Sequence, residues 1–174
     1  YATNSMVLGR TRGIGLLPHD DAVRLGVVGP VARGSGIAHD VRKDSPYAAY
    51  MDMDFNVPVY DGCCIHSRTM VRLDEVMESF GIIEQCCTRM PDGPVTAPMR
   101  QIHVAEACAR SEAPRGEVFY YIRTNGTDMP ERLKWRVPSY MNWEALSVMM
   151  RDCAVADVAL ITNSIDPCVS CTER

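Results

Sequence analysis

The sequence contains no run of like charges, and its 18 basic and 22 acidic residues give a net charge of −4. It also lacks any apolar run close to the roughly 20 residues that span a bilayer, and its first residues do not follow the charged-then-apolar order of a signal peptide. The even charge distribution excludes the electrostatic footprint of a nucleic-acid-binding protein. The other two absences predict a cytoplasmic chain, whose eight cysteines are reduced thiols and metal ligands rather than a disulfide framework.

No internal repeat and no low-complexity linker divides the chain. Its 174 residues, of which 47% are hydrophobic, suffice for one substantial core. We therefore expect one domain over residues 1–174. The chain begins with Tyr1 rather than with methionine, and its first residues carry no strong helix or strand signal. This start leads us to expect a fragment of a longer protein.

The hydrophobic pattern predicts an α+β fold, with long packed helices and a small antiparallel β-hairpin element. Glycines punctuate residues 1–36 around a short helical piece near 20–25, which indicates turns and close backbone approaches. Over residues 68–87 the apolar side chains recur at intervals of three and four, which is the pattern of an amphipathic helix.

Two strands and a last helix complete the expected fold. The strands cover residues 118–124 and 133–137, and a loop containing Asn125-Gly126 joins them into a hairpin with one buried face. The final helix should begin near Asn142, an acceptable N-cap, and run to about Asn163.

The end of the chain places Cys168 and Cys171 three positions apart, after Asp166-Pro167. Pro167 fixes its own φ and disfavours the α region at Asp166, so we expect an extended turn that presents both sulfurs. Thiolates select soft or borderline metals such as iron, nickel or zinc, and the pair is half of such a site. The spacing by itself leaves a zinc knuckle, a redox dithiol and a chance pairing open.

A resemblance to a known family rests on three segments that occur in order, Glu112–Glu117, Val137–Trp143 and Asp166–Arg174. Together they resemble the C-terminal half of a nickel–iron hydrogenase large subunit. A second set of segments resembles the energy-converting, membrane-associated branch of this family and its relative, the quinone-site subunit of respiratory complex I: Gly29–Gly36, Asp40–Lys43 and Pro46-Tyr47. The resemblance covers nearly the whole chain, so residues 1–174 are expected to form the C-terminal part of a hydrogenase large-subunit domain.

The resemblance implies a nickel–iron centre whose iron carries carbonyl and cyanide ligands. Cys168 and Cys171 would supply two of its four nickel thiolates, with Cys171 as the bridge to iron. Thiolates support redox changes of nickel and can accept a proton from heterolytic H₂ cleavage, which makes Cys168 a catalytic candidate. Arg115 would lie over the open side of the centre, where a permanently charged guanidinium can hydrogen-bond a cyanide and polarise H₂.

Three further residues receive roles from the same resemblance. Pro114 and Ser139 match positions that surround or hydrogen-bond the cyanides. Asp166, also a catalytic candidate, would anchor Arg115 and the cysteine turn.

The implied activity is that of an oxidoreductase that interconverts H₂ with protons and electrons. The electrons would pass to an iron–sulfur cluster in a small partner subunit. Membrane subunits of the complex and ferredoxin as the electron carrier are further implied partners. The chain would then be cytoplasmic and peripheral to the membrane through its partner subunits.

Two features favour the hydrogenase over its complex I relatives, which have lost the nickel thiolates and usually carry lysine where this chain has Arg115. The first is Arg115 itself, and the second is the pair of C-terminal cysteines. Arg174 stands where many soluble hydrogenases end in histidine, and arginine is typical of the energy-converting branch. The chain end also coincides with the point where the family's maturation protease removes a tail, so we expect a processed subunit.

No Cys-x-x-Cys precedes Cys168, although the family's other two nickel cysteines have this spacing near the N-terminus. We expect a missing N-terminal half or a separate polypeptide to supply them. Cys63-Cys64 and Cys86-Cys87 are poor substitutes, because adjacent side chains point in different directions. With Cys108 and Cys153, they are expected to be small buried hydrophobes.

Two alternative functions stay open. A complex I-like subunit that is not a hydrogenase could keep the cysteines for structure and act in coupling or as a scaffold. A zinc-binding interaction module could use Cys168 and Cys171 with two ligands from a partner. Nickel content separates the first alternative from the hydrogenase, and zinc without nickel or bound carbonyl favours the second.

Overall fold

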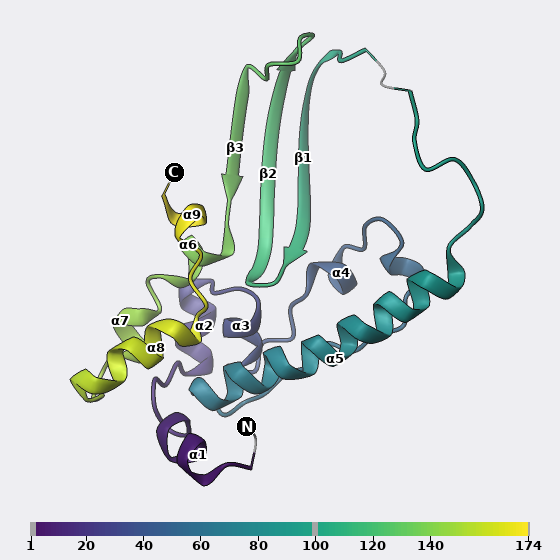
Figure 1. Cartoon of the computed structure of the whole chain (residues 1–174). Helices are drawn as coiled ribbons and strands as arrows, with labels where there is room; N and C mark the ends of the chain where they lie inside the picture. The colour runs from purple at the N-terminus through teal and green to yellow at the C-terminus, as the bar shows by residue number, and fades with distance from the viewer. Residues whose placement is uncertain (1–2, 99–100, 174) are drawn as a thin grey trace.

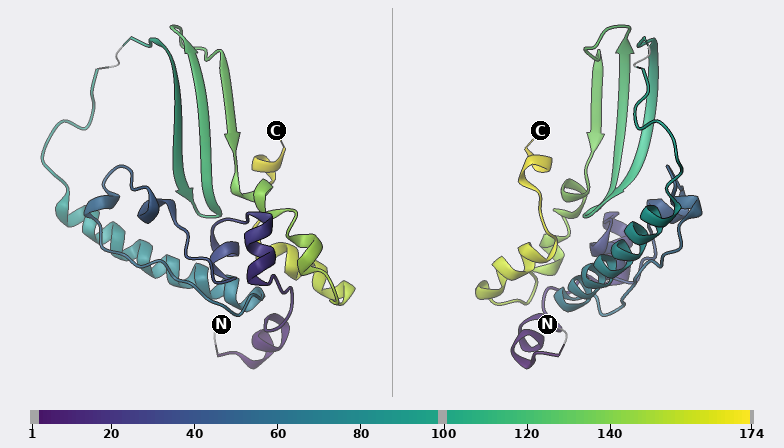
Figure 2. Two further views of the ribbon diagram at one scale, coloured as in Figure 1. Left: turned by 180° about the vertical axis from the view of Figure 1, so that it is seen from behind. Right: turned by 45° about the vertical axis from the view of Figure 1, so that its right-hand side comes forward.

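The computed structural model describes residues 3–98 and 101–173. In this part of the chain, a base of short helices and one long helix carries a three-stranded sheet that stands away from it (Figure 1). Figure 2 shows the helices gathered at one end of the sheet from two further sides. The predicted α+β class is confirmed. The elements before the long helix are α1 (Ser5–Thr11), α2 (His19–Leu25), α3 (Pro30–Arg33), α4 (Val41–Asp44) and the 3-10 turn η1 (Tyr50–Asp52).

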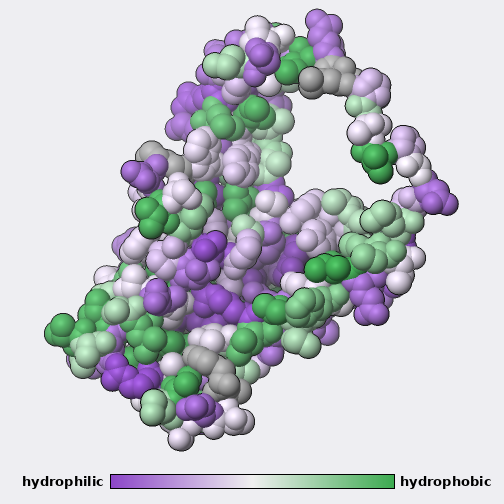
Figure 3. Space-filling model, in the orientation of Figure 1, coloured by the Kyte–Doolittle hydropathy of each residue, from purple (hydrophilic) through white to green (hydrophobic). Residues whose placement is uncertain are grey.

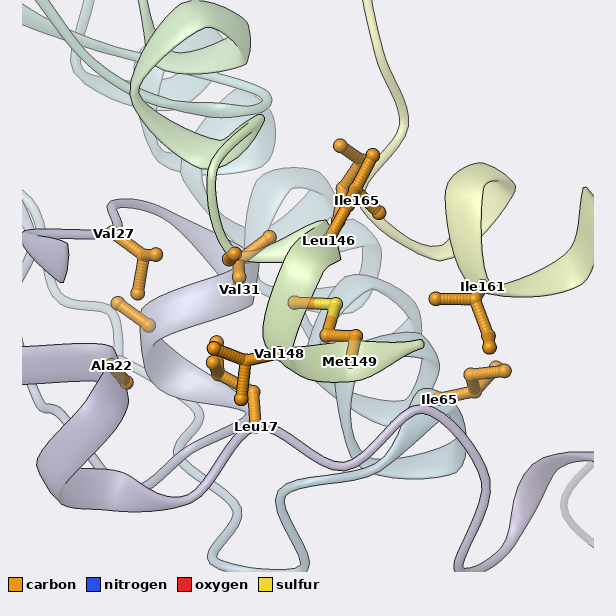
Figure 4. Packing of buried hydrophobic residues seen from close by; sticks show 12 residues of the cluster. Leu17, Ala22, Val27, Val31, Ile65, Leu146, Val148, Met149, Ile161 and Ile165 are labelled. Carbon is orange, nitrogen blue, oxygen red and sulfur yellow. The ribbon is translucent and has the colours of Figure 1, made fainter. Parts of the chain in front are cut away.

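The hydrophobic core lies where the first third of the chain meets the last third. It joins α2 and α3 to the beginning of α5 (Ile65–Arg89) and to α7 (Leu146–Met149) and α8 (Val158–Ser164), and Figure 4 shows these side chains pointing toward one another. Its members are Leu17, Ala22, Val27, Val31, Ala32, Ile65, Ala145, Leu146, Val148, Met149, Ile161 and Ile165. Each large aliphatic side chain buried in this way contributes about 1.5–3 kcal/mol. The core therefore fixes the C-terminal segment against the glycine-rich N-terminal segment.

The long helix α5 confirms the helix predicted over residues 68–87. It ends at Arg89 because Met90 precedes Pro91 and is extended, with φ −64° and ψ 121°. At 1.5 Å per residue its 25 residues span about 38 Å. No helix of residues 3–98 and 101–173, α5 included, is long and apolar enough to cross a membrane. Burial is confined to the first turns of α5, at Ile65, Ser67, Arg68 and Val71.

The apolar face of α5 continues beyond the core as a solvent-exposed row. Its large side chains keep two-fifths to two-thirds of their surface: Leu73 41%, Val76 51%, Met77 67%, Phe80 61% and Ile83 57%. We call these five residues the α5 stripe; apolar surface along α5 is visible in Figure 3. Exposed apolar rows of this kind mark interaction surfaces or aggregation-prone sites.

The exposed α5 stripe predicts that residues 1–174, expressed alone, will bind a hydrophobic dye and aggregate rather than form a stable monomer that holds nickel and iron. Dye fluorescence and light scattering measure this. A double replacement in the stripe, Phe80→Glu with Ile83→Glu, should lower both signals. Val155→Glu, at an exposed position away from α5, should not. A cooperatively melting monomer that binds nickel through Cys168 and Cys171 without another polypeptide would contradict the prediction.

The sheet has the antiparallel order β1-β2-β3, with β1 at Val104–Ala113, β2 at Gly116–Asn125 and β3 at Arg132–Arg136. The predicted strands over residues 118–124 and 133–137 are confirmed as β2 and β3. The structure adds β1, which pairs with β2 from Val104↔Asn125 to Ala113↔Gly116. Alanine, which is depleted in strands, occupies four positions of β1 and weakens the sequence signal there.

The prediction that the hairpin buries one face is wrong for this chain. Leu133 on β3 is 42% exposed, and Trp135 is only half-buried. Burial begins at Val137, where the chain re-enters the helical base. The helices reach the sheet only at that end, so the faces farther out have no covering layer among the described residues (Figure 1).

The predicted helix from Asn142 to Asn163 is also wrong, because the chain breaks there into α6 (Pro138–Asn142), α7, η2 (Val155–Asp157) and α8. Asn142 is fully buried and does not cap a helix. Its Oδ1 accepts the N–H of Val28 at 3.0 Å, and its Nδ2 donates to the Val28 carbonyl at 3.2 Å. Asp152, with φ 56°, takes the left-handed conformation and interrupts the helical path.

The predicted burial of the six other cysteines holds in full only for Cys64, which is 5% exposed. The prediction is wrong for Cys87 and Cys108, which are exposed. These two lie on the outer part of α5 and on β1, the regions that this chain leaves uncovered. The remaining three, Cys63, Cys86 and Cys153, are half-buried.

Candidate functional site

The turn between β1 and β2 and the C-terminal segment meet through Arg115 and Asp166, which are 51 positions apart. Arg115 Nε donates to the backbone oxygen of Asp166 at 2.6 Å, and Nη2 donates to Asp166 Oδ1 at 3.1 Å. Asp166 has φ 53° and turns the chain away from α8, which ends at Ser164. The two bonds fix one edge of the guanidinium. Within the described residues, Arg115 Nη1 makes no hydrogen bond.

Ser139 holds the cysteine turn from the other side. Its Oγ, in the buried first turn of α6, accepts the backbone N–H of Cys168 at 3.0 Å. Farther along, Thr172 Oγ1 donates to the Cys168 carbonyl and accepts from Trp143 Nε1, both at 3.0 Å. The backbone around the thiols is thus fixed by two separate contacts with the segment that follows β3.

Cys168 and Cys171 belong to one short helical segment, in which Cys168 is the N-cap and Cys171 follows three positions later. The expected extended turn is found at Cys168, which has φ −96° and ψ 112° and precedes α9 (Val169–Thr172), but not at Cys171, which is inside that helix. Positions three apart on a helix share a face, so the two thiols still belong to one side. The Ser170 hydroxyl, 3.1 Å from Cys168 Sγ, and after it Cys171 lower the pKa of the Cys168 thiol to about 7.

This donor set fits half of a soft-metal site. A cysteine with a lowered pKa offers the thiolate form that metals bind, and two thiolates on one side suit nickel, iron or zinc. No group of three or more His, Cys, Asp or Glu side chains able to hold a metal occurs within residues 3–98 and 101–173. The pair therefore accounts for two ligands, and the nickel–iron centre stays a prediction.

Pro114 and Asp166 line a cavity of about 390 Å³, which the sequence did not predict. Its other walls come from α3, α4, α5 and the end of β1: Arg33, Arg42, Arg72, Glu75, Val76, Ser79, Glu112 and Ala113. Most of these side chains are charged. Pro114 thus faces a polar interior that connects the site to α5.

The centre of this interior is Arg33, whose side chain is 1% exposed. Nη2 lies 2.6 Å from Glu75 Oε1, and Nη1 lies 3.0 Å from Glu112 Oε1. Burial raises the pKa of both Glu75 and Glu112, and the pairing with Arg33 partly offsets that rise. Removing one partner of a buried ion pair leaves an uncompensated buried charge and is strongly destabilising. Each of these contacts therefore stabilises the arrangement of the elements that it joins. They tie the end of β1, and with it the turn of Pro114 and Arg115, to α3 and α5.

The same turn rests directly on the glycine-rich segment. Gly29 has φ 66° and ψ −147°, and a Cβ there would lie 2.3 Å from the Arg115 carbonyl oxygen. A Cβ on Gly116 would lie 2.7 Å from the Gly29 nitrogen. Only glycine allows this approach, because any side chain would push backbone against backbone. The close approach predicted for the glycine-rich segment is found here.

We expect Gly29→Ala to destabilise the complete subunit by about 3 kcal/mol or more, since the backbone conformation and the contact with Arg115 both exclude a side chain. Thermal unfolding of the purified complex measures the loss. Gly9→Ala is the matched control, because its Cβ would meet nothing within 4 Å and its helical position favours alanine by roughly 0.5–1 kcal/mol. Equal melting temperatures for Gly29→Ala and Gly9→Ala would contradict the close approach.

The family profile of the respiratory-chain NADH dehydrogenase 49 Kd subunit matches residues 1–107 and 99–174. These ranges together cover the chain, which therefore belongs to this family of oxidoreductase subunits.

Several known proteins share substantial identity with the chain. It is 57% identical over its whole length to the carbon monoxide-induced hydrogenase of Rhodospirillum rubrum, of which it covers 48%. It is 40% identical over its whole length to a subunit of the F420H2 dehydrogenase of Methanosarcina mazei, of which it covers 49%. Over 94% of its length it is 37% identical to an NADH-quinone oxidoreductase subunit of Roseiflexus, of which it covers 46%. The chain thus spans about half the length of these relatives.

Proposed function

We propose that the chain is part of the catalytic subunit of an energy-converting nickel–iron hydrogenase, which interconverts H₂ with protons and electrons. The observation that carries the proposal is the meeting of Arg115, Ser139 and the thiol pair around Asp166 and Cys168. These residues come from three segments far apart in the sequence. The 57% identity to a carbon monoxide-induced hydrogenase supports the same assignment.

In this proposal Cys168 and Cys171 would hold the nickel–iron centre through their thiolates. The bound centre would supply heterolytic H₂ cleavage and the redox change. The protein's part is to position hydrogen-bond donors: Asp166 holds the Nε and Nη2 edge of Arg115, so Nη1 would be available as a donor to the bound centre. A guanidinium fixed before reaction stabilises developing charge without reorganising.

Ser139 and Pro114 have matching roles. Within the described residues, Ser139 Oγ accepts from the Cys168 N–H and donates to no acceptor, so its hydroxyl would be available as a donor to a cyanide of the bound centre. Pro114 borders the cavity next to Asp166 and offers no N–H that competes for these ligands.

The partners follow from the same proposal. Two more thiolates would come from the remaining N-terminal half or from a separate chain, and electrons would leave through an iron–sulfur cluster in a small subunit. Membrane subunits would hold the chain at the cytoplasmic side, and ferredoxin would serve as electron carrier.

A complex I-like role without H₂ chemistry is the second candidate. It is favoured by the 37–40% identity to subunits of NADH-quinone oxidoreductase and F420H2 dehydrogenase. A zinc-binding module is the third candidate, and the pair of thiols is its support.

Metal analysis and infrared spectroscopy of the complete complex separate the three candidates. Nickel and iron near one per subunit, with carbonyl and cyanide bands, are expected for the hydrogenase. Zinc without these bands would favour the interaction module. A complex with neither metal and intact assembly would favour the coupling subunit and overturn the proposal.

A further inference from the structure

Arg72, on α5, has a buried edge without a partner in residues 3–98 and 101–173. Its Nη1 donates to the backbone oxygen of Arg68 at 3.3 Å, whereas Nε and Nη2 are buried and make no hydrogen bond there. A buried donor left without an acceptor is destabilising, and more so when it is charged. This destabilisation is removed if an acceptor from outside the described residues binds the edge.

The charge of Arg72 is attracted by Asp166 and Glu75 only from beyond ion-pair distance, and it is repelled by Arg115 and Arg33. The neighbouring arginines each have a carboxylate: Arg33 has Glu75 at 2.6 Å, Arg42 has Asp40 at 2.6 Å and Arg115 has Asp166 at 3.1 Å. Within the same described ranges Arg72 has no ion pair. Nε and Nη2 point two N–H groups in one direction, which matches the two oxygens of a carboxylate. A carboxylate is therefore the acceptor that completes both the hydrogen bonds and the charge.

The Arg72 edge and the α5 stripe belong to one surface. Val76 lines the cavity together with Arg72 and is also a member of the stripe. The stripe continues toward Cys87, which is exposed and lies four residues after Ile83 and seven after Phe80, on the same helix face. An apolar row that ends in a buried cationic edge is suited to a polypeptide that carries apolar side chains and one acid.

We propose that the α5 stripe and the Arg72 edge receive the polypeptide that completes the subunit, with one of its Asp or Glu carboxylates bound to Arg72 Nε and Nη2. This inference rests on the proposed function, which requires further polypeptide for the other two thiolates. The relatives are long enough to include such a polypeptide, since the chain covers only 48% of the Rhodospirillum rubrum protein and 49% of the Methanosarcina mazei protein. The same cavity is lined by Pro114 and Asp166, so a segment anchored at Arg72 lies beside the thiol turn.

Thiol labelling of the complete complex tests the covered stripe. A covered thiol reacts only after local opening, so Cys87 should react with a maleimide about tenfold or more slowly than a cysteine introduced by Asp128→Cys in the exposed β2–β3 loop. Site-resolved mass spectrometry follows each rate. Equal rates at the two positions would overturn the docking of a polypeptide on the stripe.

Cross-linking tests the carboxylate. In the Arg72→Lys complex, a carbodiimide should join the new amine to an acid of the completing polypeptide, and mass spectrometry identifies the pair. Cross-links only to Glu75 or Asp166, or only to a second copy of residues 1–174, would each overturn the assignment. Arg24→Lys, at an exposed position on α2 where Arg24 pairs with Asp21, is the matched control and should link only within its own helix.

A second variant covers the case in which lysine preserves the contact too weakly to cross-link. Arg72→Gln should raise the Cys87 labelling rate by about tenfold, because the anchored segment then opens more often. Arg24→Gln should leave the rate unchanged. Unchanged Cys87 labelling in Arg72→Gln would overturn the role of Arg72. Both readouts are independent of nickel, so a failure of this docking is distinct from a failure of the hydrogenase assignment.

Discussion

Replacing Cys168 or Cys171 with serine in the complete complex is expected to abolish both nickel retention and H₂ turnover. Serine differs from cysteine by one atom, so the contacts of Ser139 and Thr172 with the backbone of this segment can persist. The donor changes completely, because an alkoxide is a harder and far more basic ligand than a thiolate. The lowered pKa of Cys168 favours the thiolate near neutral pH, and a serine hydroxyl stays protonated there.

Elemental analysis and H₂ turnover measure the loss in these two variants. Cys108→Ser is the control, because Cys108 is exposed on β1 and lies outside the site. Its nickel content and turnover should equal those of the unaltered complex. Full nickel occupancy with normal turnover in Cys168→Ser or Cys171→Ser would remove the central claim.

Local patterns predicted those elements whose side-chain spacing is set by their own geometry. The helix α5 appeared in the sequence because its apolar positions repeat along 25 residues and Pro91 ends it. The sequence did not predict the strand β1, since four of its positions are alanine, which is depleted in strands. The helix expected from Asn142 failed for a tertiary reason: the Asn142 amide binds the backbone of Val28, 114 positions away. Periodicity carries no information about such a partner.

For the candidate site, the sequence named residues that the structure brings together, but it did not predict the local conformation of the whole cysteine segment. Motif resemblance named Arg115, Ser139 and Asp166, and the structure brings them to the thiol turn; their roles at a metal stay predictions. The predicted extended conformation was wrong for the residues after Cys168, which form α9, because Pro167 constrains only Asp166 before it.

The buried charges around Arg33 were missed altogether. Glu75 lies on α5 at an ordinary polar position, and Glu112 on β1 begins the segment Glu112–Glu117 that carries the resemblance, but nothing in the sequence pairs either of them with Arg33. The only sequence signal was an arginine inside a glycine-rich segment that the fold buries. Its partners become evident when α3, α5 and the end of β1 are placed together.

Arg115→Lys should leave the metal centre assembled and lower turnover by about 10² or more, the scale for removing one preorganised electrostatic group at a reacting centre. The guanidinium makes two directed bonds to Asp166, through Nε and Nη2, and still has Nη1 for a ligand. An ammonium is a single point of charge on a flexible stem, so it cannot hold Asp166 and face the ligand in the same way. Infrared bands of the carbonyl and cyanides should persist, with the cyanide stretches shifted.

The control for this variant is Arg110→Lys, five positions earlier on the same hairpin, where the exposed arginine pairs with the buried Glu117 at 3.0 Å. That exchange keeps a cation beside Glu117, which also pairs with Arg136 at 3.1 Å, and it should change neither rate nor infrared bands. The comparison separates a positioned guanidinium from a general effect of lysine in this hairpin. An unchanged rate in Arg115→Lys, with unshifted cyanide stretches, would mean that Arg115 only joins the hairpin turn to Asp166 and takes no part at the reacting centre.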